Sequence, residues 1–401
     1  MRPQRLLLAT SLALAAGVGG AQGAGAVDAA PVAPTVRDIT AAVGVAAKVN
    51  DEYGTTAVCD LNRDGLDDWV LGRHQLAGTQ VFYGQGDGTM KLHQVLPISD
   101  RHGVDCFTAV GDARPELFIT VGADGGNSDS KSNEVWRTGS TGKLALVPGA
   151  LGLSDPSGRG RLITHLDARG DGVADDVYIG NAPPEGFPSV NKTYLKVAGG
   201  YQENASGVES TTYGRCADAA DYDKDGYDDL IAGNGSGVRL WHNRGDATFT
   251  DVADKYGISY AKACVFADVN RDGNPDLLTI GSSKLFVRLG DGNGALPLAY
   301  TLPVAGGAAL AVADLNDDGS PDIYLVRGRA DQRNQPDVLL LGNGTGRTFN
   351  DASARLPQTS VGDGHSVAVS RFQGRTRLIV LNGGQGKGIM APRQVLEFTA
   401  G

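Results

Sequence analysis

The sequence predicts an all-β fold, a seven-bladed β-propeller with four-stranded blades whose last blade is closed by the N-terminal strand. Three observations support this prediction. An acidic loop pattern recurs along the chain, short apolar stretches flank each copy, and a glycine-rich turn recurs between copies. Glycine is abundant, with 58 residues, and 41% of the residues are hydrophobic, so we expect many turns around an aliphatic core.

The N-terminus is typical of an export signal. Arg2 and Arg5 precede an apolar run, and small residues at 24–26 suit a cleavage site, with residues 21–23 as the alternative. Beyond this region no stretch is long and apolar enough for membrane insertion. The pattern predicts a secreted protein, either extracellular or periplasmic. We therefore expect a signal peptide at residues 1–26, a linker at residues 27–34 and a single propeller domain at residues 35–401.

The charge of the mature chain argues against two classes of partner. Without residues 1–26, the chain has 34 basic and 46 acidic residues, which is a formal charge of −12. An acidic surface repels nucleic acid and gains nothing from anionic lipid. It suits cations, and many of its acidic residues are clustered.

The clearest repeat is the acidic loop pattern D-x-[ND]-x-D-G-x-x-D. Its four full copies span residues 60–68, 221–229, 268–276 and 314–322, each between two short apolar stretches. Such flanks predict that the loop joins two β-strands rather than two helices. The candidate metal ligands are the side chains at positions one, three, five and nine: Asp60, Asn62, Asp64, Asp68, Asp221, Asp223, Asp225, Asp229, Asp268, Asn270, Asp272, Asp276, Asp314, Asn316, Asp318 and Asp322.

This pattern predicts calcium binding. Calcium takes about six to eight oxygen ligands, and acids spaced two apart in a tight loop can converge on one ion, with a carbonyl from position seven. Glycine at position six permits the sharp turn. One such loop could be an ordinary polar turn, but four copies make that reading improbable. Magnesium is a poorer candidate because it requires stricter octahedral geometry. We expect about four Ca²⁺ ions, which would change the formal charge from −12 to −4.

Weaker copies complete a set of seven units. Residues 167–175 keep three acids but place Arg169 at a ligand position, so this site is doubtful. Residues 110–119 keep the strands with a shortened loop, and residues 367–380 keep the strands without the acids, so we expect no ion in the second or seventh blade. The units begin 46 to 56 residues apart, which suits four-stranded blades. The doubtful ligands are Asp167, Asp171 and Asp175.

The glycine-rich turn within each unit predicts a β-hairpin. Its clearest copies span residues 81–89, 240–249 and 339–349. Glycine and asparagine supply the positive φ that hairpin turns need. No GK[ST] follows, which argues against a phosphate-binding loop.

The two ends of the chain predict how the ring closes. The last unit stops after its third strand, at residues 394–398, and residues 36–45 resemble residues 249–258, which follow the turn of the fourth unit. We therefore expect residues 35–40 to supply the outer strand of the last blade. This pairing would leave no free strand edge at the seam.

The four cysteines fall in two pairs of adjacent units. An even number in an exported chain permits disulfides. We expect Cys59 to pair with Cys106 and Cys216 with Cys264, with four buried thiols as the alternative.

The repeated acidic pattern between apolar strands resembles the FG-GAP or VCBS repeat, a family that includes the integrin α-subunit head and many secreted bacterial propellers. Together with the hairpin turn, it is most similar to bacterial relatives of cartilage acidic protein. The resemblance implies calcium in the loops between the first and second strands of each blade. It also implies that partners bind on the opposite face.

Four long connections are expected on that opposite face, at residues 123–133, 181–192, 327–335 and 383–393. Variable loops on a rigid scaffold commonly carry binding. We expect a protein or glycan ligand there, bound by a monomeric chain, with plain surface decoration as the alternative.

The leading functional hypothesis is a non-enzymatic binding or adhesion module in which calcium is a structural ion. One alternative is a carbohydrate-binding lectin, which should show an aromatic platform repeated in several blades. The other is a polysaccharide-active, lyase-like enzyme, which needs a base and positively charged partners in a cleft. The sequence shows neither the repeated platform nor a catalytic motif such as HExxH or G-x-S-x-G.

Overall fold

The computed structural model describes the greater part of the chain after residue 30. The expected signal peptide and most of the linker lie outside the described residues, so their assignment stays a prediction. Within the described residues no helix is long and apolar enough to span a bilayer. The described ranges are 31–45, 55–73, 78–108, 115–122, 132–140, 142–182, 189–210, 214, 216–233, 237–328, 335–383 and 392–400.

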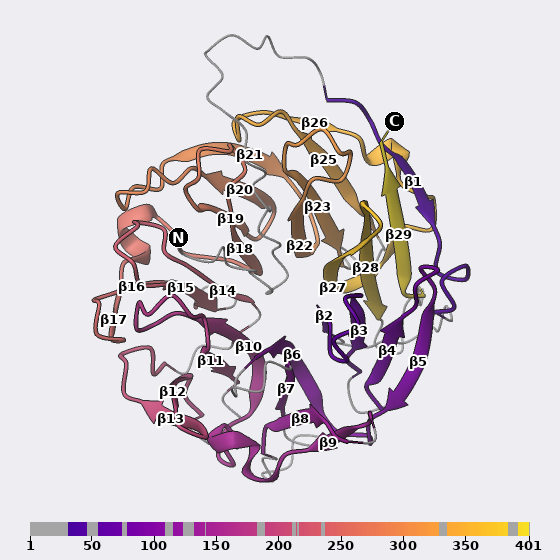
Figure 1. Ribbon diagram of the computed structural model, residues 1–401. Helices are drawn as coiled ribbons and strands as arrows, with labels where there is room; N and C mark the ends of the chain where they lie inside the picture. The colour runs from indigo at the N-terminus through magenta and orange to yellow at the C-terminus, as the bar shows by residue number, and fades with distance from the viewer. Residues whose placement is uncertain are drawn as a thin grey trace.

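Seven antiparallel sheets surround a central axis, which confirms the seven-bladed propeller (Figure 1). From the axis outward, blade 1 contains β2 (Thr56–Cys59), β3 (Asp68–Leu71), β4 (Gln80–Gly84) and β5 (Met90–Val95). Blade 2 contains β6 (Arg101–Phe107), β7 (Glu116–Val121), β8 (Glu134–Thr138) and β9 (Leu144–Leu146). Blade 3 contains β10 (Gly160–Leu166), β11 (Asp176–Asn181), β12 (Lys192–Val197) and β13 (Gly200–Asn204).

The next three blades repeat this order. Blade 4 contains β14 (Cys216–Ala220), β15 (Asp229–Gly233), β16 (Arg239–Asn243) and β17 (Phe249–Asp251). Blade 5 contains β18 (Ala263–Ala267), β19 (Asp276–Ile280), β20 (Lys284–Arg288) and β21 (Leu298–Pro303). Blade 6 contains β22 (Gly307–Ala313), β23 (Asp322–Arg327), β25 (Val338–Gly342) and β26 (Phe349–Asp351). Short 3₁₀ segments lie at Pro148–Gly152, Ala253–Tyr256 and Ser353–Arg355.

Blade 7 closes the ring with a strand from the other end of the chain. It contains β27 (Val361–Phe372), β28 (Arg375–Gly383), β29 (Gln394–Thr399) and β1 (Thr35–Asp38), and the short β24 (Gln335–Pro336) pairs with β27. In the β1–β29 ladder Thr35 lies opposite Thr399 and Asp38 opposite Leu396. Figure 1 shows β1 beside β29 at the rim. The expected N-terminal closure is therefore confirmed.

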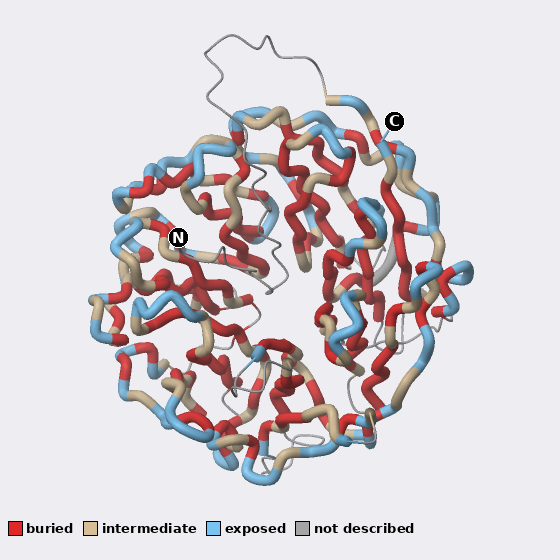
Figure 2. The backbone as a smooth tube through the Cα atoms, viewed as in Figure 1, coloured by how far each residue is buried: buried red, intermediate tan, exposed pale blue. Residues whose placement is uncertain are grey.

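The core consists of aliphatic clusters between neighbouring blades. The second strand of a blade is covered on both sides, which is why β15 and β19 read as continuous buried runs rather than alternating ones. One cluster joins blade 1 to blade 7 and includes Trp69, Leu71 and Ile379. Figure 2 shows this burial in the inner strands, while exposed residues gather at the rim.

Two disulfides join the innermost strands of adjacent blades. Cys59 on β2 is bonded to Cys106 on β6, and Cys216 on β14 is bonded to Cys264 on β18, as the sequence led us to expect. Disulfides persist in oxidising compartments. They therefore indicate a location outside the cytoplasm.

Removing one of these bonds should destabilise the ring. The two bonds span sequence separations of 47 and 48 residues, and closing loops of this length removes about 4 kcal/mol of chain entropy from the unfolded state. A C59A/C106A variant should lose that free energy of unfolding in a urea titration followed by circular dichroism. The C216A/C264A variant serves as the matched comparison and should lose a similar amount. Unchanged unfolding in both variants would show that the bonds add no stability.

Candidate metal-binding loops

The four full acidic loops share one backbone conformation. Position six is a glycine with positive φ in each loop, as the sequence predicts: Gly65 (84°), Gly226 (99°), Gly273 (81°) and Gly319 (83°). Position four is also left-handed, although none of its residues is glycine: Arg63 (66°), Lys224 (59°), Arg271 (63°) and Asp317 (58°). Such conformations are costly for ordinary residues. Four copies with the same two left-handed positions indicate a turn that is held by specific contacts.

The first acid of each loop supplies part of that support. In blade 1 the Asp60 carboxylate accepts hydrogen bonds from the backbone N–H of Asp64 (3.0 Å) and of Gly65 (2.9 Å). Asn62 Oδ1 accepts from the same Asp64 N–H at 2.8 Å. Asp268 and Asp314 repeat the Asp60 contacts in blades 5 and 6. The loop thus draws the candidate ligands at positions one, three and five together.

The ninth acid begins the second strand and is buried. Asp68 Oδ2 accepts from the Leu61 N–H (2.9 Å), and its Oδ1 accepts from the Gly84 N–H at the end of β4 (3.0 Å). The equivalent residues of blades 4, 5 and 6 make the same pair of contacts: Asp229, Asp276 and Asp322. This carboxylate therefore ties the loop to the third strand of its own blade.

The eighth position has a separate structural role that the sequence pattern did not reveal. Asp67 Oδ2 in blade 1 accepts from the Arg371 N–H of blade 7 at 2.7 Å. Asp228 Oδ2 in blade 4 accepts from the Asp167 N–H of blade 3, also at 2.7 Å. These two acids join each loop to the preceding blade.

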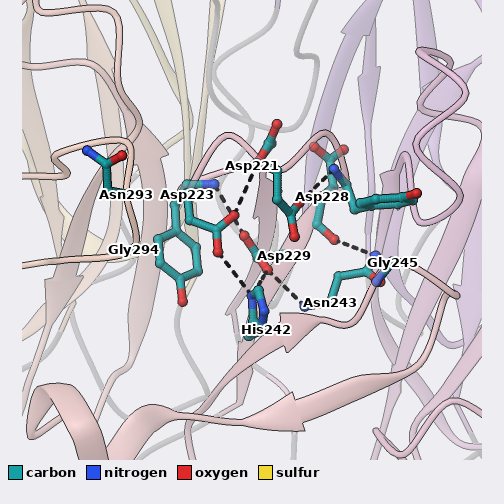
Figure 3. A network of polar contacts seen from close by, with 12 residues as sticks. Asp221, Asp223, Asp228, Asp229, His242, Asn243, Gly245, Asn293 and Gly294 are labelled. Atoms are coloured by element: carbon teal, nitrogen blue, oxygen red, sulfur yellow. Dashed lines mark hydrogen bonds and ion pairs between the residues drawn. The ribbon is translucent and has the colours of Figure 1, made fainter.

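Blade 4 has the densest acidic cluster (Figure 3). One ligand oxygen from each of Asp221, Asp223 and Asp225 lies within 4.8 Å of the others. His242 completes a second group, because its Nδ1 lies 3.3 Å from Asp223 Oδ2 and 3.1 Å from Asp229 Oδ1. His242 was missed as a site residue because it lies on β16, outside the loop. The position of His242 beside Asp229 depends on the strand register, in which Leu230 lies opposite Trp241.

The Asp221 carboxylate provides a test of whether a cation fits. Its Oδ2 accepts from the Gly226 N–H at 3.0 Å, while its Oδ1 is buried with no hydrogen-bond partner. In blades 1, 5 and 6 the corresponding oxygen accepts from the N–H at position five. A buried carboxylate oxygen without a partner is costly. A cation held between Asp221, Asp223 and Asp225 would satisfy it, so the residues fit a metal ion.

Burial raises the pKa of every ninth-position acid in these four loops. The pKa is about 7 for Asp68, about 9 for Asp229, about 7 for Asp276 and about 8 for Asp322. Neighbouring loop carboxylates raise these values further, and the backbone N–H donors lower them in part. Without a cation these sites therefore resist full ionisation at neutral pH.

The loop of blade 3 is one residue longer than its alignment with the acidic pattern predicted. Leu166 lies opposite Asp176, just as Ala220 lies opposite Asp229, so Asp176 rather than Asp175 begins the second strand. Asp176 Oδ1 also accepts from the Lys196 N–H of the third strand (2.8 Å), the contact typical of position nine. The inserted residue was invisible in the sequence because both aspartates fit the pattern.

The second-blade loop is not shortened, which corrects the expectation from sequence. Strand β6 ends at Phe107 and β7 begins at Glu116, and these two residues lie opposite each other. The connection therefore has the same nine positions as the full loops, with Glu116 at position nine. Residues 109–114 lie outside the described residues.

The opposite end of the inner strands is hollow. A cavity of about 150 Å³ is lined by residues from all seven inner strands, among them Thr56, Leu162, Cys216 and Ser366. The four long connections expected on this face lie largely outside the described residues. Their proposed role in binding therefore stays a prediction.

Comparison with known proteins agrees with this architecture. The model of the FG-GAP-like repeat matches residues 221–279 and 268–325, which include the acidic loops of blades 4 to 6. The chain contains FG-GAP-like repeats. The loop of blade 1 lies outside the matched residues but has the same two left-handed positions. No curated protein matches the chain.

Several solved structures are similar over most of this FG-GAP propeller. A lectin of Agrocybe aegerita, described for specific recognition of non-reducing terminal N-acetylglucosamine, has a TM-score of 0.49 and 18% identity over 77% of this chain and 80% of its own. The Photorhabdus luminescens Tc holotoxin pore has a TM-score of 0.36 and 17% identity over 86% and 17%. The Malassezia sympodialis allergen Mala s 1 has a TM-score of 0.40 and 12% identity over 70% and 89%.

The raised pKa values predict how the metal-free protein responds to pH. Each ninth-position acid has a folded pKa above its unfolded value of 3.8, so the folded state binds more protons than the unfolded state between those values. Stability should therefore fall as the pH rises from about 5 to about 8. The measurement is the melting temperature in a chelator across this range.

A divalent ion should reverse that trend, because it stabilises the ionised carboxylates. The gain in melting temperature on adding calcium should therefore be larger at pH 8 than at pH 5. A metal-free melting temperature that rises with pH would contradict the assignment of the ninth-position acids.

Proposed function

We propose that this chain is a calcium-stabilised binding or adhesion module that acts outside the cytoplasm, with calcium as a structural ion in four loops. The observation that carries the proposal is the repeated loop geometry, with converging oxygen ligands and the unpartnered Asp221 Oδ1 in blade 4. The two disulfides and the export signal of the sequence support secretion.

The donor set favours calcium over other metals. Positions one, three, five and nine offer carboxylate and amide oxygens, and position seven offers a carbonyl, which are the hard ligands that calcium prefers. The four loops together hold 13 acids at these positions. Crowding so many carboxylates without cations would be electrostatically costly. Magnesium fits less well because it requires stricter octahedral geometry.

The position of the loops supports a structural role for the ion. Each loop connects the first and second strands, and its ninth acid also contacts the third strand. A bound ion would therefore rigidify three strands of one blade at one end of the ring. This arrangement leaves the opposite end for a partner.

A protein or glycan ligand on that opposite face is the second part of the proposal. The second strands end on that face, where residues from all seven inner strands line the cavity. The Cys216–Cys264 disulfide lines this cavity and would keep the inner strands of blades 4 and 5 fixed. A rigid base under variable loops suits recognition by a monomeric chain.

Chelation should destabilise the protein, and calcium should restore it. Without the ions, several clustered carboxylates remain in each loop. The folded state also loses the stabilisation that it gains from an ion that does not bind the unfolded state. The expected result is a clear fall in melting temperature in excess EDTA and full recovery with calcium, measured by scanning calorimetry. An identical melting curve in EDTA and in calcium would reject the metal assignment.

A pair of variants tests whether calcium binds in the loops. D225A removes the fifth-position ligand of blade 4 and should reduce the calcium bound per chain by one, measured by isothermal titration calorimetry. D254A removes an exposed acid of the same blade outside the loop and should leave the count unchanged. Loss of one ion in both variants would show that general surface charge, rather than the loop, binds calcium.

A binding experiment tests the role of the ion separately from its presence. The purified chain is applied to a glycan array and used to capture partners from the cell surface of its own source, with and without EDTA. If calcium is structural, a ligand found in this way should still bind in EDTA at temperatures where the metal-free protein remains folded. Loss of binding by protein that circular dichroism shows to be folded would instead place calcium in the ligand contact.

A further inference from the structure

The strand register identifies position nine in blades that lack the acidic pattern. In blades 1 and 4 the residue before the loop lies opposite the ninth residue. The same rule assigns position nine to Asp176 in blade 3 and to Glu116 in blade 2. Blade 7 has no such position, because β27 and β28 stay paired up to Phe372 and Arg375 and only two residues connect them.

In blade 3 a guanidinium lies where the acids converge. Arg169 Nε lies 3.0 Å from Asp176 Oδ2, and its Nη2 lies 2.8 Å from Asp175 Oδ1 and 3.4 Å from Asp171 Oδ2. The loop otherwise keeps the shared fold, since Gly170 and Gly172 have positive φ and Asp167 accepts from the N–H groups of positions five and six. Arg169 stands at position three, where the full loops have Asn or Asp.

Blades 2 and 7 show the same pairing by different routes. In blade 2 the buried Glu116 binds Arg137 of the third strand, with Arg137 Nη2 at 2.7 Å from Oε1. In blade 7 a two-residue turn replaces the loop, and Arg377 on the second strand places its Nη2 2.9 Å from Oε2 of Glu397 on the third strand. Both residues of the blade 7 pair are buried.

The three blades with an Asn-containing loop differ. Among the residues that the structure describes, no lysine or arginine pairs with Asp68, Asp276 or Asp322, which accept only backbone N–H groups. A buried carboxylate needs a compensating charge. Blades 2, 3 and 7 have one within the chain, and blades 1, 5 and 6 do not.

We infer that an arginine side chain takes the place of a metal ion as the partner of the ninth-position acid in blades 2 and 3, and that Arg169 alone prevents the third loop from binding an ion. This inference rests on the proposed calcium role of the four full loops. It makes Arg169 the residue that sets the number of ions, because the third loop retains Asp171, Asp175 and Asp176 around the guanidinium and Asp167 at position one.

The test replaces Arg169 by the residue found at position three of the full loops. Arg169→Asn should bind one more calcium ion per chain than the wild type, measured by isothermal titration calorimetry and elemental analysis of the dialysed protein. In EDTA the variant should melt at least about 3 °C below the wild type, because Asp171, Asp175 and Asp176 lose their cationic partner. Calcium should remove that difference.

Two control variants make the result specific. Arg239→Asn removes an exposed arginine that pairs with Asp251 in blade 4, and should change neither the ion count nor the melting temperature in EDTA. Arg169→Lys keeps the charge and should bind no additional ion. Circular dichroism verifies that all variants are folded.

Other outcomes would overturn the inference. If Arg169→Asn is destabilised in EDTA but binds no additional ion, the guanidinium does not stand in for a metal. An unchanged ion count together with an unchanged melting temperature would overturn it as well. A wild type that binds no calcium contradicts the proposed function instead, and the melting temperatures in EDTA still report on Arg169.

Discussion

The buried carboxylate at position nine is the constraint on which this propeller depends. It begins the second strand, accepts N–H groups from the loop and from the third strand, and thereby fixes the geometry at one end of each blade. Burial raises its pKa to about 7 in Asp68 and about 9 in Asp229, which shows how strongly the site disfavours an uncompensated charge. A blade with a buried acid at this position therefore requires a compensating positive charge, which Arg137 supplies in blade 2 and Arg169 in blade 3, and which we propose that calcium supplies in the four full loops.

The ring supplies the framework that makes these local sites equivalent. Pairing with β1 satisfies the backbone hydrogen-bonding groups on the outer side of β29. The two disulfides connect innermost strands of adjacent blades. Asp67 and Asp228 add contacts between a loop and the blade before it. Because each blade packs chiefly on its neighbours, a change of cation in one loop can remain local, as expected for repeat architectures.

The division of charge between the two ends of the ring has a functional consequence. The acidic loops gather at one end, where arginine side chains and, in our proposal, calcium ions neutralise them and make this end rigid. At the other end of the ring, residues near the start of the inner strands line a cavity of about 150 Å³. A scaffold that is rigid at one end and open at the other suits the binding role proposed for this chain.

The sequence by itself determined the repeat, the blade number, the positions of the four full acidic loops and the seam, and it favoured the two cysteine pairs, because each depends on residues that are close along the chain or on a regular spacing. Only the tertiary structure decided which side chain compensates the acid at position nine. Arg137 and His242 reach that acid from a neighbouring strand, and Asp176 replaces Asp175 through a one-residue insertion. Contacts across strands follow from register, and register is set by turn lengths and packing that no local pattern encodes.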